Sequence, residues 1–283
     1  MANALTSIRE IEREVAALRI APGSDVPYLR TSVMTHTAWV PPEWVEAAED
    51  VLTGLAERHP SRTIVLVPEP EQEDGLEANV EVDVFPSGEG RQIWAETIRI
   101  RLKGSRVSAP ASVVQPLFLP DLPAFLRWRG VPSFGGDSFE SLVRVVDRLI
   151  VDSTEWDELP SSYAKLAGVF DRVTVSDIAW ARTSRWRTEL ATLWPEIGSV
   201  ERIRVTGTAA QAELLAGWLR SRLGRPVQLE HLPADHLEAV EIDGKPAPFP
   251  PGDPPPPSDL LSEQLDRFER DRVYEEAVRS AAG

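Results

Sequence analysis

The stretch Thr63-Ile64-Val65-Leu66-Val67 is the most decisive part of this chain for the fold. Such a compact run of apolar and β-branched residues is typical of a strand that is buried on both faces, in the middle of an α/β sheet. An amphipathic helix is expected just before it, over residues 41–58, with Pro41-Pro42 in the first turn, where a missing N–H group costs little. The sequence therefore predicts an α/β fold around this strand.

An antiparallel hairpin is predicted directly after the central strand. Residues 77–85 and 91–102 both have strand character, and the link between them is a short turn, Pro86-Ser87-Gly88-Glu89-Gly90. Valines at every second position from 80 to 84 alternate with acidic residues, which predicts that one face of the hairpin is in contact with water.

Helices and strands alternate along the rest of the chain, as is typical of mixed α/β sheets. Thr208 is expected to cap one helix, and Gly224 to end it in the left-handed conformation. Ser176 or Asp177 is expected to cap a longer helix. The predicted helices cover residues 6–18, 109–119, 137–146, 158–169, 177–194 and 208–223, and the predicted strands cover residues 30–40, 122–128, 149–151, 202–206, 227–231 and 239–242.

The length of 283 residues favours two domains, because a domain typically has about 150 residues. We expect an N-terminal α/β domain over residues 1–152 and a C-terminal α/β domain over residues 153–245. A boundary near residue 107 is the alternative to the one near residue 152.

Residues 246–283 are expected to form an extended proline-rich linker and an amphipathic C-terminal helix over residues 259–280. Prolines are so dense from 246 to 257 that this part is predicted to be extended and semi-rigid. Two alternatives stay open for the segment: it reaches a neighbouring molecule as an arm, or it folds back on its own chain.

The chain is strongly acidic, with 45 acidic and 30 basic residues and a formal net charge of −15. Duplex nucleic acid and anionic membranes both reward a positive surface, so neither is expected as a partner. There is no cysteine, which excludes disulfides and thiolate chemistry. The N-terminal residues lack the apolar core of a signal peptide, and no run is long enough to span a membrane, so we expect a cytoplasmic protein.

The sequence carries no recognisable catalytic or cofactor motif. The nucleophile-elbow pattern, the Walker A loop and the G-x-G-x-x-G pattern are missing, and the four histidines lack metal-binding spacing and are interpreted as structural. The acidic residues from 152 to 158 are interpreted as a solvated loop. Gly135-Gly136 and Thr206-Gly207-Thr208 precede predicted helices, where an anion could bind, but a plain turn is the simpler interpretation. We expect no cofactor, no metal and no enzymatic activity.

Two short stretches concentrate tryptophan and arginine: Phe125-Leu126-Arg127-Trp128-Arg129-Gly130 and Trp180-Ala181-Arg182-Thr183-Ser184-Arg185-Trp186-Arg187. Exposed tryptophan and arginine often anchor a protein partner, and a guanidinium group grips carboxylate or phosphate. The candidate partner-binding residues are Trp128, Arg129, Trp180, Arg182, Arg185 and Trp186. In one alternative the tryptophans belong to the core; in another the stretches bind single-stranded nucleic acid, which the acidic charge disfavours.

Several segments also match a known family in order, from about residue 31 to residue 223. The main segment is Ser112-Val113-Val114-Gln115-Pro116-Leu117-Phe118-Leu119-Pro120-Asp121-Leu122-Pro123, which is followed by Trp128-Arg129-Gly130. Five shorter segments support it: Thr35-His36-Thr37-Ala38-Trp39-Val40-Pro41, His59-Pro60-Ser61-Arg62, Asp177-Ile178-Ala179-Trp180-Ala181-Arg182, Trp186-Arg187 and Leu215-Ala216-Gly217-Trp218-Leu219. These segments resemble the OpcA family, the glucose-6-phosphate dehydrogenase assembly proteins of cyanobacteria and actinobacteria. Arg127 departs from the signature, in which an apolar or aromatic residue is expected.

The resemblance implies two α/β regions in one chain and a non-catalytic protein that binds glucose-6-phosphate dehydrogenase and promotes its assembly or activity. The six candidate residues come from the chemistry of tryptophan and arginine and not from the family. The alternative is a sugar-phosphate- or nucleotide-binding regulatory protein or enzyme, with Arg129, Arg182 or Arg185 holding the phosphate. A third possibility is a scaffold that joins partners through residues 246–283, and self-association is left open.

Overall fold

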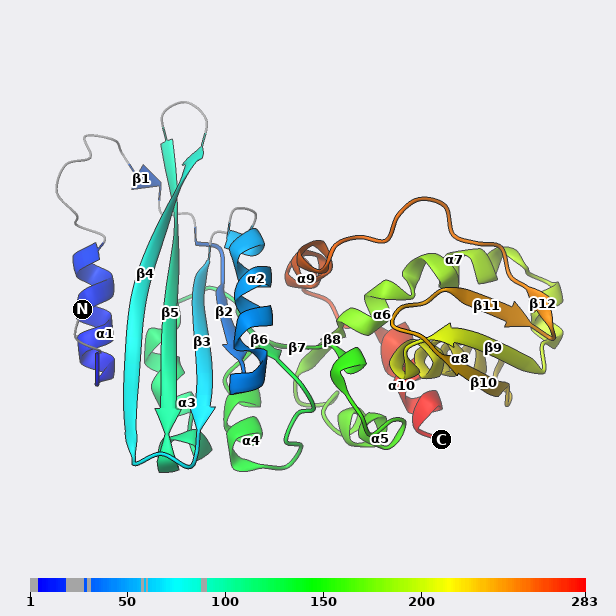
Figure 1. The fold of residues 1–283 in the computed structure, drawn as a ribbon, viewed down its shortest axis with the longest axis horizontal. Coiled ribbons are helices and arrows are strands. Elements are labelled where there is room, and N and C mark those ends of the chain that lie inside the picture. The colour runs from blue at the N-terminus through cyan, green and yellow to red at the C-terminus, as the bar shows by residue number, and fades with distance from the viewer. Residues whose placement is uncertain (1–4, 19–27, 30–31, 57–58, 60, 88–90) are drawn as a thin grey trace. The chain divides into compact units, whose positions relative to one another are not determined.

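The computed structural model describes residues 5–18, 28–29, 32–56, 59, 61–87 and 91–283. Within this part the chain divides into two compact units (Figure 1). The first unit contains Met1–Ile150 and Pro257–Asp266, and the second contains Val151–Pro256 and Arg267–Gly283. Helices and mixed sheets make up the structure, which confirms the predicted α/β class. The three-part division expected from the sequence stays a prediction.

The sheet of the first unit has the predicted central strand in its middle. Its strands, in spatial order, are β1 (Tyr28–Leu29), β5 (Arg91–Lys103), β3 (Arg62–Glu69), β2 (Thr35–Trp39), β6 (Ala124–Trp128) and β7 (Arg148–Val151). Each neighbouring pair in this order is parallel. β4 (Gly75–Ser87) is antiparallel to β5 along its whole length, which confirms the predicted hairpin.

Helices cover both faces of this sheet because the central strands are apolar on both sides. On one face, Ala38, Val40 and Val65 pack against α2. On the other face, Trp39 stacks on Trp128, which meets Phe139 of α4 edge to face. The helices of the unit are α1 (Ile8–Leu18), α2 (Val45–Ala56), α3 (Ala111–Val114), α4 (Asp137–Val143) and α9 (Pro257–Leu265). α3 is much shorter than the predicted helix over residues 109–119, because it continues only as one 3₁₀ turn that contains Pro116.

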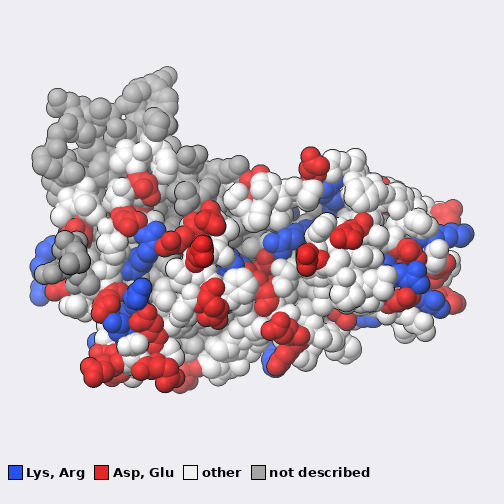
Figure 2. Space-filling view, viewed as in Figure 1, with Lys and Arg blue, Asp and Glu red and all other residues white. Residues whose placement is uncertain are grey.

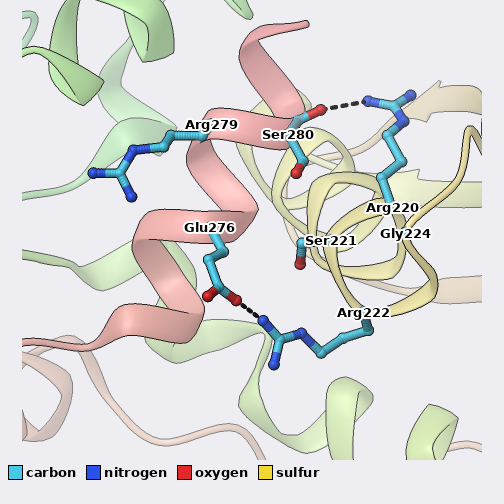
Figure 3. A pocket seen from close by; sticks show the side chains of 7 residues that line it. All are labelled: Arg220, Ser221, Arg222, Gly224, Glu276, Arg279 and Ser280. Carbon is cyan, nitrogen blue, oxygen red and sulfur yellow. Dashed lines mark hydrogen bonds and ion pairs between the residues drawn. The ribbon is translucent and has the colours of Figure 1, made fainter.

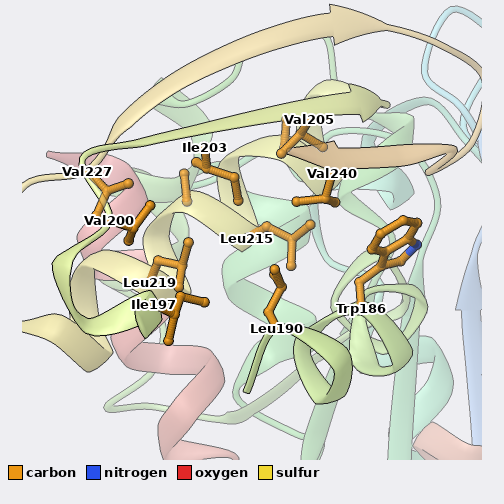
Figure 4. Close-up of a cluster of buried hydrophobic side chains, with 12 residues drawn as sticks. Trp186, Leu190, Ile197, Val200, Ile203, Val205, Leu215, Leu219, Val227 and Val240 are labelled. Carbon is orange, nitrogen blue, oxygen red and sulfur yellow. The ribbon is translucent and has the colours of Figure 1, made fainter. Parts of the chain in front are cut away.

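The second unit has a smaller sheet over which α8 packs. In spatial order its strands are β10 (Gln228–Pro233), β9 (Arg202–Gly207), β11 (Ala239–Ile242) and β12 (Lys245–Pro246), of which only β10 and β9 are parallel. Its remaining elements are α5 (Ser161–Ala167), β8 (Thr174–Asp177), α6 (Ile178–Arg182), α7 (Ser184–Thr192), α8 (Ala209–Leu223) and α10 (Arg272–Ala282). Figure 4 shows the core between the sheet and the helices, where Leu215 of α8 and Leu190 of α7 face the valines and Ile203 of the strands.

Both ends of α8 follow the sequence prediction. Thr208 and Gln211 form a reciprocal capping box at the N-terminus, and Gly224 ends the helix with a φ of 63°. These short polar and glycine signals act within one turn of the chain, so the sequence reveals them directly.

The single helix predicted over residues 177–194 is wrong. The chain instead forms β8, α6 and α7, and Asp177 caps α6 by accepting a hydrogen bond from the N–H of Ala179. The two helices meet at Thr183, whose buried hydroxyl donates to the carbonyl of Trp180 at 2.8 Å. A threonine hydroxyl that takes a helix carbonyl competes with the continuing helical hydrogen bonds, which accounts for the break.

The single C-terminal helix predicted over residues 259–280 is also wrong. It is divided into α9 and α10, and Asp271 begins α10 by accepting a hydrogen bond from the N–H of Tyr274. α9 packs on α2 in the first unit, whereas α10 packs on α5 and α8 in the second. The structure thus matches the alternative in which this segment folds back on its own chain.

α8 and α10 lie in close contact at Gly217. A Cβ atom on Gly217 would overlap the backbone oxygen of Ala277 and would lie 3.0 Å from the Cβ atom of Ala281. The absence of a side chain at this position therefore lets the C-terminal helix dock.

We predict that Gly217→Ala destabilises the protein by about 2 kcal/mol, because α10 must shift to accommodate the methyl group. In an unconstrained helix the same change stabilises by about 1 kcal/mol, so the sign of the effect is diagnostic. Urea unfolding measures it. Ser221→Ala, one turn further along α8, is the control and is expected to change stability by less than about 0.5 kcal/mol. A gain in stability for Gly217→Ala would contradict the close helix contact.

Candidate functional site

The structure places the three candidate tryptophans inside the protein. The exposed fractions of Trp128, Trp180 and Trp186 are 2%, 4% and 5%. This burial agrees with the alternative that they belong to the core. Trp128 lies in the first unit and the other two lie in the second. A role for any of them in binding a partner stays a prediction.

The Trp128-Arg129 stretch is held by other aromatic residues. Trp128 and Trp39 stack with their ring centroids 4.8 Å apart and their planes at 16°. The guanidinium carbon of Arg129 lies 4.6 Å from the centre of the Trp44 ring, a cation–π contact within the first unit. Both residues therefore contribute to the fold of the unit that carries them.

Trp180 and Arg182 are fixed by carboxylates. The indole Nε1 of Trp180 donates to Oδ2 of Asp271 at 2.9 Å, and Arg187 stacks on the Trp180 ring at 3.4 Å. Burial lowers the pKa of Arg187 to about 10. Arg182 donates to both carboxylate oxygens of Asp152 at 2.8 Å. Asp152 itself is buried, so its assignment to a solvated acidic loop is wrong.

Arg185 and Trp186 contact the proline-rich segment of their own chain. The Arg185 guanidinium donates to the carbonyl oxygens of Pro250 at 3.2 Å and Gly252 at 2.5 Å, and also to that of Pro251. The Trp186 ring meets the ring of Phe249 edge to face, with centroids 5.5 Å apart. No local pattern of residues indicates this contact, because its two sides are about 65 residues apart.

A buried polar cluster around Asp177 was missed by the sequence analysis, which identified only the capping role of this residue. Asp177 accepts hydrogen bonds from the backbone and the hydroxyl of Ser153, at 3.0 and 2.6 Å, and from the hydroxyl of Tyr274 at 3.3 Å. The Ser153 hydroxyl also lies 2.9 Å from that of Tyr163. Burial, together with the nearby charge of Asp152, raises the pKa of Asp177 to about 6.

The Asp177 cluster resembles a catalytic arrangement in composition but not in access. Ser153 and Tyr274 are fully buried, and Asp177 is 1% exposed. A nucleophile or general base must reach its substrate within hydrogen-bond distance. The cluster instead connects Tyr274 of α10 with the start of α6, and so it holds the C-terminal helix.

The histidines have different environments. His36 is fully buried with both ring nitrogens unpartnered among the described residues, and burial together with the charges of Arg127 and His59 lowers its pKa to about 4. His59 Nε2 lies 2.5 Å from the Ser262 hydroxyl, and His231 Nε2 lies 2.8 Å from the carbonyl oxygen of Gly207. Among the described residues, no three histidine or acidic side chains gather as a metal site requires.

Three of the segments that resemble the OpcA signature meet in the first unit. Arg62 donates to Glu96 at 2.9 Å and to the carbonyl of Leu117 at 2.7 Å. The Thr35 hydroxyl accepts from the N–H of Leu119 at 3.0 Å. The segment around Leu117 is therefore fixed against the beginnings of β2 and β3.

A cavity of about 700 Å³ lies where α8 ends against α10 (Figure 3). It is lined by Arg220, Ser221, Arg222, Gly224, Glu276, Arg279 and Ser280. Arg222 pairs with Glu276, and Arg220 donates to the carbonyl of Ser280 at 3.4 Å. Figure 3 shows Arg279 pointing away from Arg220, so the three guanidinium groups do not converge on one point.

Several partly exposed basic residues of the first unit are paired with acids. Arg99 pairs with Glu81 and Glu49, and Lys103 pairs with Glu77. On the face drawn in Figure 2, basic side chains lie among acidic ones. Pairs of this kind contribute about 1 kcal/mol or less each. In the ranges that the structure describes, no helix has both the length and the apolar character needed to cross a membrane.

The fold and these contacts define a two-unit α/β protein in which the six candidate tryptophan and arginine residues contact other parts of the same chain. The chain belongs to the OpcA family. Two family models match it, and they are described as the N-terminal domain and the C-terminal domain of a "Glucose-6-phosphate dehydrogenase subunit". The model of the N-terminal domain matches residues 52–168, and that of the C-terminal domain matches residues 173–249.

Curated relatives named "Putative OxPP cycle protein OpcA" are similar to this chain. The protein from Synechocystis sp. is 27% identical over 192 residues, which cover 63% of this chain and 40% of the relative. The protein from Nostoc punctiforme is 26% identical over 195 residues, covering 64% and 42%. The protein from Synechococcus elongatus is 25% identical over 182 residues, covering 60% and 41%. The matched part is thus about two fifths of the length of these relatives.

We predict that Arg62→Ala lowers the free energy of unfolding by about 3–5 kcal/mol, because Glu96 stays buried without the guanidinium that it faces. Arg101→Ala is the matched control, since its side chain is 63% exposed and pairs with Glu69. The control should cost about 1 kcal/mol or less. Urea unfolding of both variants provides the comparison, and similar losses would contradict a structural role for the Arg62 pair.

Asp177 gives a prediction about pH. Its pKa is about 6 in the folded protein and 3.8 in the reference state, so the folded protein binds the proton more tightly. The contribution of Asp177 is therefore most favourable below about pH 4 and is lost as the pH rises through 6. Two pKa units correspond to at most about 3 kcal/mol.

Asp177→Asn should remove this pH dependence and still cap α6, because asparagine caps helices as well as aspartate does. The free energy of unfolding of wild type and variant is measured from pH 4 to pH 7. As the pH rises, the wild type should lose stability relative to the variant. A difference that is constant over this range would show that Asp177 does not titrate there.

Proposed function

We propose that this chain is a non-catalytic assembly factor that binds glucose-6-phosphate dehydrogenase in the cytoplasm and promotes its active oligomer. The observation that carries the proposal is the match of two family models, each described as a domain of a glucose-6-phosphate dehydrogenase subunit, in order along the chain. The three OpcA relatives are named for the OxPP cycle, which supports the same metabolic context.

The chemistry of the described residues supports binding rather than catalysis. Asp177, whose carboxyl group has a raised pKa, is inaccessible to a substrate. Arg182 already donates hydrogen bonds to both carboxylate oxygens of Asp152. A catalytic site needs titratable groups that reach the reacting atoms. Neither group has this access, so the proposal assigns the chemical step to the dehydrogenase alone.

The proposed mechanism is a shift of population among the forms of the dehydrogenase. A protein that binds the assembled form more tightly than the separate protomers stabilises the assembled form by the ratio of the two affinities. A ten-fold ratio is worth about 1.4 kcal/mol, and equal affinity for both forms shifts nothing. The chain therefore needs no contact with the substrate to raise the rate.

The alternative is a regulatory protein or enzyme that binds a sugar phosphate or a nucleotide. The cavity between α8 and α10 favours it, because three arginines line that cavity. Titration calorimetry of the chain alone with glucose 6-phosphate and with NADP separates the two functions. Saturable heat with either ligand, lost in Arg222→Gln, would favour the alternative.

Mixing the chain with the glucose-6-phosphate dehydrogenase of its own organism should give a complex in size-exclusion chromatography with light scattering. We expect a larger share of the active oligomer and a higher rate at sub-saturating substrate. An unrelated NAD-linked dehydrogenase is the control and should show neither effect. The proposal is wrong if no complex forms and the rate, the oligomeric state and the substrate affinity of the enzyme all stay unchanged.

A further inference from the structure

The proline-rich segment of residues 247–256, here called the strap, lies against α7 in the second unit. It begins at the small sheet, where β12 pairs with β11 and the N–H of Ala247 donates to the carbonyl of Val240 at 2.8 Å. Beyond this point the strap contains six prolines, which have no N–H group to donate to a sheet. The strap must therefore be held by contacts other than backbone pairing.

Arg185 and Trp186, two of the candidate partner-binding residues, hold the strap. The Arg185 guanidinium gathers the carbonyl oxygens of three successive residues from Pro250 to Gly252. Gly252 has a φ of 77°, a conformation that favours glycine and lets the chain turn beside this guanidinium. All three acceptors face the same nitrogen of the guanidinium group, Nη2, so the strap presents a row of carbonyl oxygens to its two N–H groups.

The burial of the two aromatic rings in this contact is unequal. Trp186 is only 5% exposed, whereas Phe249 is 72% exposed. Trp186 also belongs to the core cluster between the small sheet and the helices, so Phe249 covers only part of its ring and is hardly buried itself. Most of the strap is exposed as well, including Pro248 and residues 251–254. A segment with few buried contacts opens at low cost compared with the rest of a fold.

We propose that the strap is a cover, occupying in cis a recognition face formed by Arg185 and Trp186. Its displacement uncovers, beside Arg185, the part of the Trp186 ring that Phe249 meets, and tryptophan and arginine are among the residue types that most often dominate a protein interface. The strap itself indicates the chemistry of the partner: an extended segment with an aromatic side chain that presents successive carbonyl oxygens. This inference rests on the proposed function, and the segment is assigned to glucose-6-phosphate dehydrogenase.

A cover of this kind lowers the apparent affinity for the partner. The apparent dissociation constant is the intrinsic one divided by the fraction of open molecules, so weakening the closed state tightens binding. An aromatic pair contributes enough to change the open fraction roughly three- to ten-fold. Phe249→Ser should accordingly tighten dehydrogenase binding by this factor.

Fluorine NMR of protein labelled with 5-fluorotryptophan reports on the strap without the dehydrogenase. The Trp186 resonance is assigned by its loss in Trp186→Phe. In Phe249→Ser this resonance should move towards the value of an exposed tryptophan, while the dissociation constant of the dehydrogenase complex, measured by interferometry, falls. Leu232→Ser removes an apolar side chain that is 43% exposed on β10, and it should change neither quantity.

Gly252→Val is a second strap variant, because valine is strained at a positive φ and no aromatic ring is lost. It should move the Trp186 resonance and lower the dissociation constant of the dehydrogenase complex, in the same directions as Phe249→Ser. The proposal that the strap is a cover would be overturned if the strap variants expose Trp186 and bind the dehydrogenase no more tightly than wild type. It would also be overturned if the Trp186 resonance moves in neither strap variant. Failure of the wild type and both variants to bind would instead overturn the proposed function, and with it the assignment of the partner.

Discussion

The structure depends on the requirement that a charged side chain removed from water finds a partner inside the protein. Arg62 meets Glu96 and the carbonyl of Leu117, and Asp177 receives donors from Ser153 and Tyr274. Every one of these contacts joins segments that are far apart in sequence. Because an unpaired charge inside the protein costs several kcal/mol, each contact fixes which segments lie together as well as how tightly they pack.

The local elements of the fold could be predicted because they depend on neighbouring residues. The apolar run in β3, the hairpin of β4 and β5, and both caps of α8 are properties of a few consecutive positions. The predictions failed at Thr183 and at Asp271, where a single side chain ends or begins a helix. At both places the break falls in a short run of polar residues, 182–185 and 269–272, which one continuous helix could place on its exposed face, so the sequence pattern does not separate two helices from one.

The candidate site could be predicted less well, because periodicity shows which residues share a face but not what covers that face. Trp128 is covered by Trp39, Trp180 by Tyr274, and Trp186 by Phe249. Each covering residue comes from a segment far away in sequence, and the sequence holds no local trace of these pairs. The Asp177 cluster was missed for the same reason, since Tyr274 is 97 residues from Asp177.

The cover over Arg185 also determines where the energy of partner binding comes from. Arg185 is hydrogen-bonded to the strap when the face is closed, and it is hydrogen-bonded to the partner's carbonyls when the face is occupied. Exchanging one set of neutral acceptors for another yields little net energy. The gain must then come from burying Trp186 against a larger or better-fixed aromatic side chain than Phe249 and from the conformational freedom that the released strap recovers. Neither of these contributions depends on charge, so the part of the affinity that this face supplies varies little with salt, although the protein is strongly acidic.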